Sequence, residues 1–587
     1  MLAGINKTSF NFLIEKAAML RREINKIRLS PKQYLKANCQ SPNLDDDDRS
    51  DITFLTNLNF QALISAETKN MSSRNIVILS FLPLPYVLKM EGILARLLVG
   101  RGWTINILAN VSMKRLAKSY HQSTQGFSVH LIEDYLSFNN IKKINLKITK
   151  LFQTENLDIA IIKQQYWDGV PVGVHALATY LSGEPEGRYD NSKTGRKRLK
   201  RILRRSMLYV EAANNFLLDA KPNLILGMEK GFVGTCEIFY TALQKKINYV
   251  QWVGCHEPNS IMFKKYKWES RRDHPFSIGE YDWAWIQKLP WSEIYRDKLM
   301  QEFNVGYMRG DWFKYKFLTE KQSFSESYDL KISLGLDVKK KTAIIYSHIL
   351  SDANLFYGED LFSNGYEEWL VETVRRARVN DNVNWVLKLH PANRVRNLRM
   401  GYFGDYGELQ ALRNAFGEVP DFLNIVLPES TISPMSFFQI TDYGITVRGT
   451  VGIELPCFGI PVLTAGTGRY SGKGFTNDAS DIEHYLYMIE NIHEIKPLSD
   501  TQVKLAIMYA YFVFRVRPAK YDEILVDTYV HDHKHPRYRD LKVRLPKLAD
   551  INKNPQMQAI LDFLEDQSCA DFFSDMKAPI SIQSNKI

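Results

Sequence analysis

Residues 74–108 read RNIVILSFLPLPYVLKMEGILARLLVGRGWTINIL. The apolar run Asn75–Phe81 predicts a buried strand, and Glu91–Val99 predicts a helix that stops at Gly100. Thr104–Leu108 then predicts a second buried strand. A buried strand, a helix of about ten residues and another buried strand form a βαβ unit, which implies a parallel sheet. This stretch therefore predicts an α/β fold.

The same alternation continues in two series. The first series has these further expected elements: strands at Phe127–Ile132, Leu157–Ile162, Pro222–Met228 and Tyr249–Val253, and a helix at Thr235–Lys245. The second series has these: strands at Thr342–Ser347, Val383–Leu389, Phe422–Val426 and Ile460–Thr464, a buried segment at Phe437–Asp442, and helices at Tyr366–Arg378 and Val451–Phe458. Two series joined end to end predict two Rossmann-like domains.

The chain has 587 residues, which is too long for one hydrophobic core. We expect a helical N-terminal extension at 1–71 and a first Rossmann-like domain at 72–330. A second Rossmann-like domain is expected at 331–498, and C-terminal helices with a polar tail at 499–587.

The composition is that of an ordinary soluble protein, with 45% apolar and 24% charged residues. Five cysteines stand singly with no CxxC pair, so we expect reduced thiols. The longest uncharged apolar run, Ile76–Leu88, is well short of the roughly 20 residues that span a bilayer. With no secretory signal at the N-terminus, the expected location is the cytoplasm.

The net charge of +11 favours acidic partners such as phosphates, nucleotides or an anionic membrane surface. The densest basic cluster is Lys193–Arg205. It predicts either a solvated helix face or a peripheral contact with anionic lipid at the inner face of the membrane. Nucleic acid is not expected, because no recognised motif accompanies the charge.

Three candidate residues lie at the carboxyl end of the strand Val383–Leu389, where a parallel sheet binds its ligands. They are Lys388, His390 and Pro391. A histidine in this place can donate a hydrogen bond to a phosphate and assist its departure.

A second group lies in the strand-to-helix turn ITDYGITVRGT at 440–450 and the segment after it. Its members are Gly444, Thr446, Arg448, Gly449, Thr450, Gly452 and Glu454. Small residues let a phosphate approach the backbone, and Arg448 adds a full positive charge. Glu454 could reach a ribose hydroxyl.

A third group is the glycine-rich loop AGTGRYSGKGFT at 465–476, which contains Arg469. Flexible loops at the carboxyl end of a strand commonly bind ligands. We interpret this loop as a mobile cover over the bound molecule.

The order of these motifs resembles a known family. KLHP at 388–391, TDYG at 441–444, GTVGIELPCFGIPVLTAG at 449–466, GRYSGKGFT at 468–476 and SHILSDANLFYGEDLF at 347–362 are similar to bacterial capsule polysaccharide biosynthesis proteins. That family includes the β-Kdo transferases of capsule export and is more distantly similar to polysialyltransferases and CDP-glycerol glycerophosphotransferases. The resemblance covers residues 341–476 well.

The resemblance implies a GT-B glycosyltransferase that moves a sugar from a nucleotide sugar, its co-substrate, to a capsular or other surface polysaccharide or glycolipid. It implies that His390 and Pro391 contact the nucleotide phosphate and that Glu454 lies near the ribose or the donor sugar. Such enzymes usually take their general base from the first domain. The candidates here are Glu229, His256 and Glu257. No cofactor and no metal ion are expected, because cations can neutralise the leaving nucleotide.

Two other functions stay open. One is an isomerase similar to UDP-N-acetylglucosamine 2-epimerase, which needs acids for proton abstraction and no acceptor. The other is a non-catalytic protein that binds glycans or nucleotides within a polysaccharide assembly complex.

Overall fold

The computed structural model describes residues 74–574 except 124–125, 138–139, 156, 185, 309–326, 351–353, 533–534, 545–547 and 567. The extension expected at 1–71 lies outside the described residues. The chain forms two compact units. The first contains the described residues up to Gly183 together with Tyr189–Tyr249, and the second contains Glu184–Arg188 and the described residues from Val250 onward.

The first unit is built on a parallel sheet in which the strands lie in the order β4-β1-β2-β3. Their bounds are β1 (Arg74–Leu79), β2 (Trp103–Ala109), β3 (Ser128–Leu131) and β4 (Leu224–Gly227). Ile76 pairs with Ile105 on one side and with Leu224 on the other. The βαβ unit predicted from residues 74–108 is therefore confirmed, with β1 buried between two neighbours.

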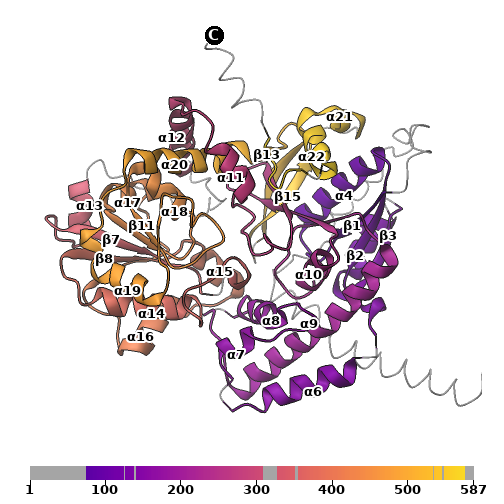
Figure 1. Cartoon of the computed structure of the whole chain (residues 1–587), viewed down its shortest axis with the longest axis horizontal. Helices are drawn as coiled ribbons and strands as arrows, with labels where there is room; N and C mark the ends of the chain where they lie inside the picture. Colours follow the sequence, from indigo (N-terminus) through magenta and orange to yellow (C-terminus); the bar gives the residue numbers. More distant parts are fainter. Residues whose placement is uncertain are drawn as a thin grey trace, which may run out of the picture. The chain divides into compact units, whose positions relative to one another are not determined.

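The helices of the first unit are α4 (Pro85–Gly100), η3 (Val111–Met113), α5 (Lys114–Ala117), η4 (Lys118–Ser123), η5 (Ile132–Tyr135), α6 (Ile141–Phe152), α7 (Ile159–Lys163), α8 (Val172–Leu181), α9 (Lys193–Ala220) and α10 (Cys236–Gln244). Helix α4 begins at Pro85, six residues before the predicted start, because proline fits the first helical position. Helix α9 is 28 residues long and packs against α6 and α8 (Figure 1).

The strand predicted at Leu157–Ile162 is wrong, because this segment forms helix α7. The Asp158 carboxylate accepts a hydrogen bond from the Ile161 backbone N–H at 2.8 Å and so caps the first turn. Capping by aspartate is a stronger local signal than a short apolar run.

The second unit contains a six-stranded parallel sheet with the order β12-β11-β10-β7-β8-β9. Its strands are β7 (Lys341–Tyr346), β8 (Val383–Lys388), β9 (Leu423–Val426), β10 (Tyr443–Thr446), β11 (Val462–Thr464) and β12 (Asn477–Asp478). Strand β7 is central and alternates its side chains: Ala343 and Ile345 join one apolar cluster, and Ile344 joins another. Both faces of the sheet are therefore covered.

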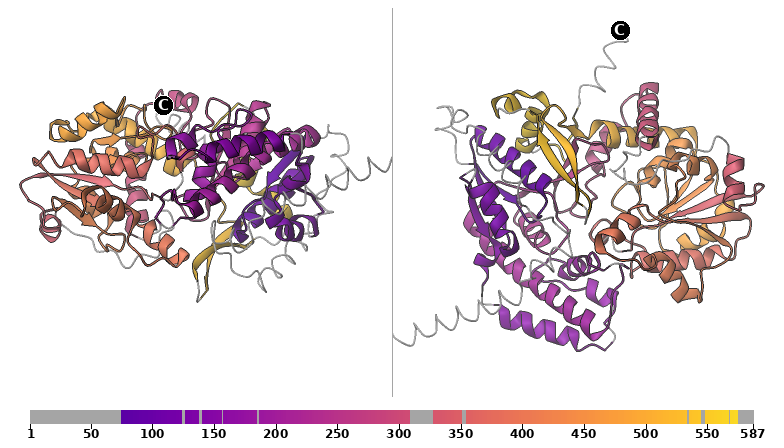
Figure 2. Two further views of the ribbon diagram at one scale, coloured as in Figure 1. Left: turned by 90° about the horizontal axis from the view of Figure 1, so that it is seen from below. Right: turned by 180° about the vertical axis from the view of Figure 1, so that it is seen from behind.

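Helices α14 (Tyr366–Ala377), α16 (Gly407–Phe416) and α19 (Ile482–Glu490) lie on one face of this sheet (Figure 1). Helices α13 (Ser327–Ser333) and α17 (Pro434–Ile440) lie on the other, and Figure 2 shows the same sheet from behind. The buried segment expected at Phe437–Asp442 thus belongs to a helix. The further short elements are η7 (Asn354–Phe356), α15 (Ala392–Met400), α18 (Val451–Glu454), η8 (Leu455–Phe458) and η9 (Ile492–Glu494).

The described residues of 250–330 belong to the second unit, whereas the sequence predicts this range in the first domain. Helices α11 (Glu280–Ile286) and α12 (Glu293–Met308) pack their apolar faces against α20 (Asp500–Tyr511) in one core cluster. Trp283 is buried in that cluster beside Tyr509. Tyr295, Phe303 and Tyr307 of α12 belong to the same cluster.

The remaining elements of the second unit are β5 (Asn248–Gly254), which enters it from the first unit, β6 (Ser260–Tyr266), η10 (Phe512–Val516), β13 (Ala519–Lys520), β14 (Leu525–Asp532), β15 (His535–Val543), α21 (Leu548–Lys553) and α22 (Pro555–Glu565). Strand β13 pairs antiparallel with β6, and β14 forms a hairpin with β15. The predicted fold class, two Rossmann-like α/β domains of GT-B type, is confirmed. Among the described helices, none combines the length and the apolar character that crossing a bilayer requires.

Candidate functional site

The carboxyl ends of four neighbouring strands of the second unit form the candidate site. Strands β11, β10, β7 and β8 are adjacent and parallel, so the residues that follow them share one edge of the sheet. His348 follows β7 and His390 follows β8. Arg448 follows β10, and the loop that contains Arg469 follows β11. The second-domain motifs predicted from the sequence therefore meet at one edge.

His390 is held in one orientation by the start of helix α15. Its Nδ1 accepts a hydrogen bond from the Ala392 backbone N–H at 3.1 Å, and its own backbone N–H donates to Ser347 Oγ at 3.2 Å. Burial and the nearby Lys388 charge lower the pKa of His390 to about 4. At neutral pH the imidazole is uncharged, and because Nδ1 accepts, Nε2 carries the proton. His390 can therefore donate one hydrogen bond to an anion.

A buried carboxylate supports the backbone around His390. Ser347 Oγ donates to Glu408 Oε1 at 3.1 Å, and Asn393 Nδ2 donates to the same oxygen at 2.6 Å. Burial raises the pKa of Glu408. Glu408 thus links the segment after β7 to helix α15, which follows Pro391.

His348 is a site residue that the sequence reasoning did not select. Its Nε2 accepts a hydrogen bond from the Val447 backbone N–H at 3.1 Å and lies 3.0 Å from Thr446 Oγ1. Its ring stacks on Tyr366 with 4.5 Å between centroids. Burial and the charge of Arg448 lower the pKa of His348, so it is neutral and ties β7 to the turn after β10. The available signal was its place directly after a buried strand.

The glycine-rich turn after β10 is packed by side chains of the same unit. Thr446 Oγ1 accepts a hydrogen bond from the Gly449 backbone N–H at 3.1 Å. A Cβ at Gly452 would lie 2.0 Å from the Tyr470 hydroxyl, which donates to the Gly449 carbonyl at 2.8 Å. The space beside Gly452 is therefore occupied by Tyr470.

The helix after this turn is short. Helix α18 begins after Thr450, has four residues and continues as the 3₁₀ helix η8, which contains Pro456. A Cβ at Gly444, in β10, would lie 2.5 Å from Leu455 Cδ1, so this glycine lets η8 pack on the strand. Because α18 has only four residues, the partial positive charge at its N-terminus is small.

Two arginines at the site differ in how their charges are balanced. Arg448 is buried and forms an ion pair with Asp360, and it also donates to the carbonyls of Tyr357 and Glu359. Its charge is neutralised within the protein. Arg448 thereby fastens the segment 357–360 to the end of β10.

Arg469 is only 9% exposed and forms no ion pair with any residue that the structure describes. One Nη donates to the Arg448 carbonyl at 3.3 Å, and Nε has no partner. The guanidinium lies over the Phe276 ring, 5.6 Å from its centroid. Burial lowers the pKa of Arg469. The loop predicted to be a mobile cover thus has Arg469 and Tyr470 buried, and it brings a cation without an ion pair to the edge of the sheet.

The other predicted donor residues have partners of their own. Lys388 Nζ lies over the Phe437 ring, 5.2 Å from its centroid. Glu454 is buried, and burial together with a hydrogen bond to Glu454 raises the pKa of Tyr307. Glu454 therefore contacts a side chain of α12.

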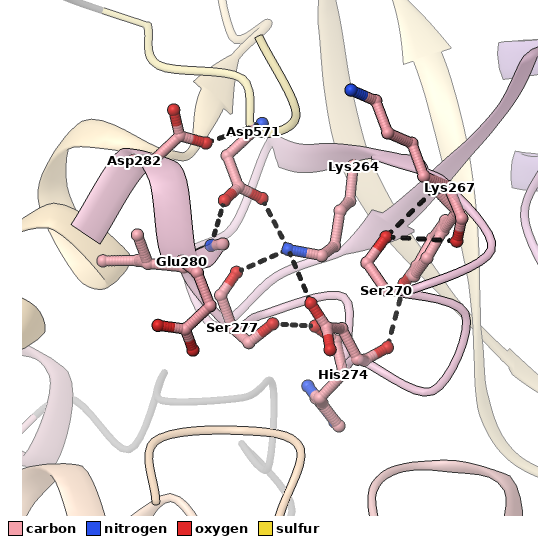
Figure 3. Close-up of polar contacts among 12 residues, drawn as sticks. Lys264, Lys267, Ser270, His274, Ser277, Glu280, Asp282 and Asp571 are labelled. Atoms are coloured by element: carbon pink, nitrogen blue, oxygen red, sulfur yellow. Dashed lines mark hydrogen bonds and ion pairs between the residues drawn. The ribbon is translucent and has the colours of Figure 1, made fainter. Parts of the chain in front are cut away.

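The loop 270–279 is held by the polar contacts that Figure 3 shows. Its Ser277 carbonyl accepts hydrogen bonds from Lys264 Nζ at 3.2 Å and from Arg517 at 2.8 Å. Both cations pair with the buried carboxylate of Asp571. On the other side of the loop, the His274 backbone N–H donates to the Gly468 carbonyl at 2.8 Å. The loop that places Phe276 under Arg469 is therefore anchored by a buried ion network.

The candidate bases lie in different units. Glu229 follows β4 in the first unit, where its Oε1 accepts hydrogen bonds from the backbone N–H groups of Lys230 at 2.8 Å and Gly231 at 3.0 Å. His256 and Glu257 follow β5 and lie in the second unit. These candidates therefore do not form one cluster within a unit.

His256 and Glu257 meet Glu302 of α12, with ligand atoms within 4.8 Å of one another. The sequence shows no sign of a metal-ligand cluster here, because Glu302 is far along the chain from His256 and Glu257. Glu257 pairs with Lys520 at 2.5 Å and Glu302 with Arg515 at 2.6 Å. Each carboxylate already has a cation, so the group is balanced by the protein itself. Burial raises the pKa of Glu257.

The basic cluster Lys193–Arg205 forms the first turns of α9. The Arg196 guanidinium donates to the carbonyls of Phe152, Thr154 and Glu155. Arg198 lies over the Tyr180 ring. Much of this charge therefore contacts the first unit, and contact with a membrane stays a prediction.

No protein-family model and no curated protein matches the sequence. Among solved structures, the chain is similar to the β-Kdo 2,4 transferase of KpsC from Thermosulfurimonas dismutans, with a TM-score of 0.29, 12% identity and coverage of 49% of this chain and 87% of that one. It is also similar to UDP-GlcNAc 2-epimerase from Neisseria meningitidis bound to UDP-GlcNAc, with a TM-score of 0.24, 13% identity and coverage of 74% and 95%.

A third similar structure is Alr3699/HepE of Anabaena in complex with UDP-glucose, with a TM-score of 0.25, 12% identity and coverage of 74% and 93%. None of these structures is similar enough to assign an activity to this chain.

Proposed function

We propose that the second unit binds the phosphate groups of a nucleotide sugar at the carboxyl ends of β7, β8 and β10. The observation that carries the proposal is the buried guanidinium of Arg469, which forms no ion pair with any described residue and which the carboxylate of Glu454 influences without direct contact. A buried cation without an ion pair is costly, and a phosphate would supply the negative charge and an acceptor for its remaining N–H groups. His390 would add one hydrogen bond from Nε2.

On this basis the protein is a glycosyltransferase that moves the sugar to a capsular or other surface polysaccharide or glycolipid. A base takes the proton from an acceptor hydroxyl, whose oxygen bonds to the anomeric carbon. The bond from that carbon to the phosphate oxygen breaks, and the nucleotide leaves with its negative charge. Glu229 and Glu257 are the candidate bases. The raised pKa of Glu257, caused by burial, suits an acid–base role.

Thermal unfolding with CMP-, CDP-, UDP- and GDP-sugars tests the binding step, because a ligand that binds the folded state raises the Tm. We expect one nucleotide class to raise the Tm. His390→Ala should remove most of that shift. His484→Ala, a change of an exposed histidine in the same unit, is the matched control. If none of the four classes raised the Tm, or if His390→Ala bound as well as the wild type, the site would be misassigned.

Nucleotide release with a capsule-type acceptor tests the transfer step. The expected result is release that depends on the acceptor, with the sugar recovered on the acceptor. An epimerised sugar formed without acceptor would instead identify an isomerase. The His256–Glu257–Glu302 group of the second unit favours this second candidate function, because epimerisation needs acids near the sugar. Binding with neither product would indicate the non-catalytic role.

A further inference from the structure

A buried carboxylate marks the carboxyl end of the sheet in the first unit. Glu133 lies in η5, directly after β3. Its two oxygens accept hydrogen bonds from the Tyr209 hydroxyl at 2.6 Å and from the Val111 backbone N–H at 3.0 Å. Val111 follows β2, so Glu133 joins the ends of two neighbouring strands. Both of its oxygens have donors.

Arg205 lies one turn before Tyr209 on helix α9, so both side chains lie on the same helix face. Arg205 is only 7% exposed. Burial raises the pKa of Glu133, and the charge of Arg205, one turn of α9 before the Tyr209 that donates to this carboxylate, opposes that rise. The two groups are nevertheless not in ion-pair contact. Within the described chain the Arg205 guanidinium makes no hydrogen bond, and its Nε is enclosed.

Three other arginines of the cluster have partners. Arg196 donates to three backbone carbonyls, and Arg204 Nε donates to Asn145 Oδ1 at 2.8 Å. Arg198 lies over the Tyr180 ring. Arg205 is more buried than Arg196 and Arg204, and its enclosed Nε has no hydrogen-bond partner among the described residues.

Arginine presents its donors as a planar fork that fits two oxygens of a carboxylate or a phosphate. Removing such a group from water without giving it acceptors costs free energy. The edge of the sheet beyond β2 and β3 is also where a parallel sheet binds ligands. An anionic ligand at this edge would give the Arg205 guanidinium the acceptors that it lacks.

We propose that Arg205 binds the carboxylate or phosphate group of a sugar at a second site, in the first unit, beside Glu133 and Tyr209. That this bound sugar is the acceptor rests on the proposed function, since a glycosyltransferase needs a second site for the molecule that receives the sugar. The Tyr209 hydroxyl holds Glu133, so these two residues position the site and Arg205 makes the contact.

Binding of three free sugars, glucuronic acid, glucose 6-phosphate and glucose, tests the site by calorimetry without any turnover. We expect the wild type to bind at least one anionic sugar ten times more tightly than glucose. The sugar that binds identifies the group as a carboxylate or a phosphate. Equal affinity for all three sugars in the wild type would overturn the proposal.

Arg205→Gln should abolish the preference for the anionic sugar. Arg204→Gln removes the same charge from the adjacent position, where the side chain has a partner, and should keep the preference. Arg205→Lys retains the charge and loses the fork, so we expect a weaker preference, reduced at least threefold. This variant decides the matter if Arg205→Gln does not fold. An unchanged preference in the variants of Arg205 would show that this residue does not bind the anion.

The same samples separate this proposal from the proposed function. If nucleotide sugars neither bind nor react while the Arg205-dependent preference is present, the transferase proposal fails and the anion site stands. If nucleotide sugars bind and react while the wild type shows no preference, the anion site fails alone.

Discussion

The carboxylate of Asp571 accepts a hydrogen bond from Lys264 Nζ at 3.0 Å, although 307 positions of sequence separate the two residues. Asp571 also pairs with Arg517 at 3.0 Å and accepts the Gly279 backbone N–H at 2.7 Å. All three charged side chains are buried. Figure 3 shows the contact between Lys264 and Asp571. The segment that contains Asp571 is therefore part of the core of the second unit.

Asp571→Asn should destabilise the protein by about 3 kcal/mol, because it leaves Lys264 and Arg517 buried with an excess of positive charge. Urea unfolding at pH 7 measures the free energy of unfolding. Asp522→Asn, at an exposed position, is the matched control and should change it by less than about 0.5 kcal/mol. Equal effects of the two substitutions would show that the buried network contributes nothing.

Asp282, which lies beside Asp571, makes the stability of the protein depend on pH. Burial and the neighbouring Asp571 carboxylate raise the pKa of Asp282 to about 6, against an ordinary value of 3.8. Between these values the folded protein binds more protons than the unfolded chain, so this group's contribution to stability is present below about pH 4 and is lost as the pH rises through 6. Asp282→Asn should therefore stabilise the protein relative to the wild type more at pH 7.5 than at pH 4.5.

Thermal unfolding of both proteins at the two pH values tests this sign. A Tm difference that is the same at both pH values, or larger at pH 4.5, would contradict the raised pKa.

The fold could be predicted from the sequence where burial alone shapes the pattern. The apolar runs Asn75–Phe81, Thr104–Leu108 and Val383–Leu389 predict strands because both faces of a parallel sheet are covered. The prediction failed at Leu157–Ile162, where Asp158 caps a helix. It also placed residues 250–330 in the first domain, because the packing of α11 and α12 on α20 depends on residues about 200 positions later.

The sequence could predict those residues of the candidate site that directly follow a predicted strand. His390, Arg448 and Arg469 follow strands, and parallel strands end at one edge of the sheet. Sequence could not tell which arginine carries a free charge, because Asp360, the partner of Arg448, is 88 positions away. Arg205 was equally hidden, since its basic neighbours on α9 suggest a solvated face.

Gly452→Ala should destabilise the second unit by about 2 kcal/mol and weaken nucleotide binding. The new Cβ would lie 2.0 Å from the Tyr470 hydroxyl, so the Tyr470 ring must move and its hydrogen bond to the Gly449 carbonyl is lost. Gly100→Ala is the matched control, because no atom lies within 4 Å of its added Cβ at the end of helix α4. It should be neutral or slightly stabilising. Urea unfolding and thermal shift with the bound nucleotide measure both effects, and a neutral Gly452→Ala would contradict the packing of Tyr470.

Arg469→Met should raise stability and lower nucleotide affinity at once. The wild-type guanidinium is buried without an ion pair, and methionine fills similar space with no charge to desolvate, so we expect a gain of about 1 kcal/mol without ligand. Nucleotide affinity should fall at least tenfold, which corresponds to about 1.4 kcal/mol. Arg448→Met is the matched control with the opposite sign, because it leaves Asp360 without its cation and should cost about 3 kcal/mol. Unfolding with and without nucleotide resolves the two effects. A loss of stability in Arg469→Met equal to that in Arg448→Met would mean that Arg469 is a structural cation, and the site would then lack the charge on which nucleotide binding depends.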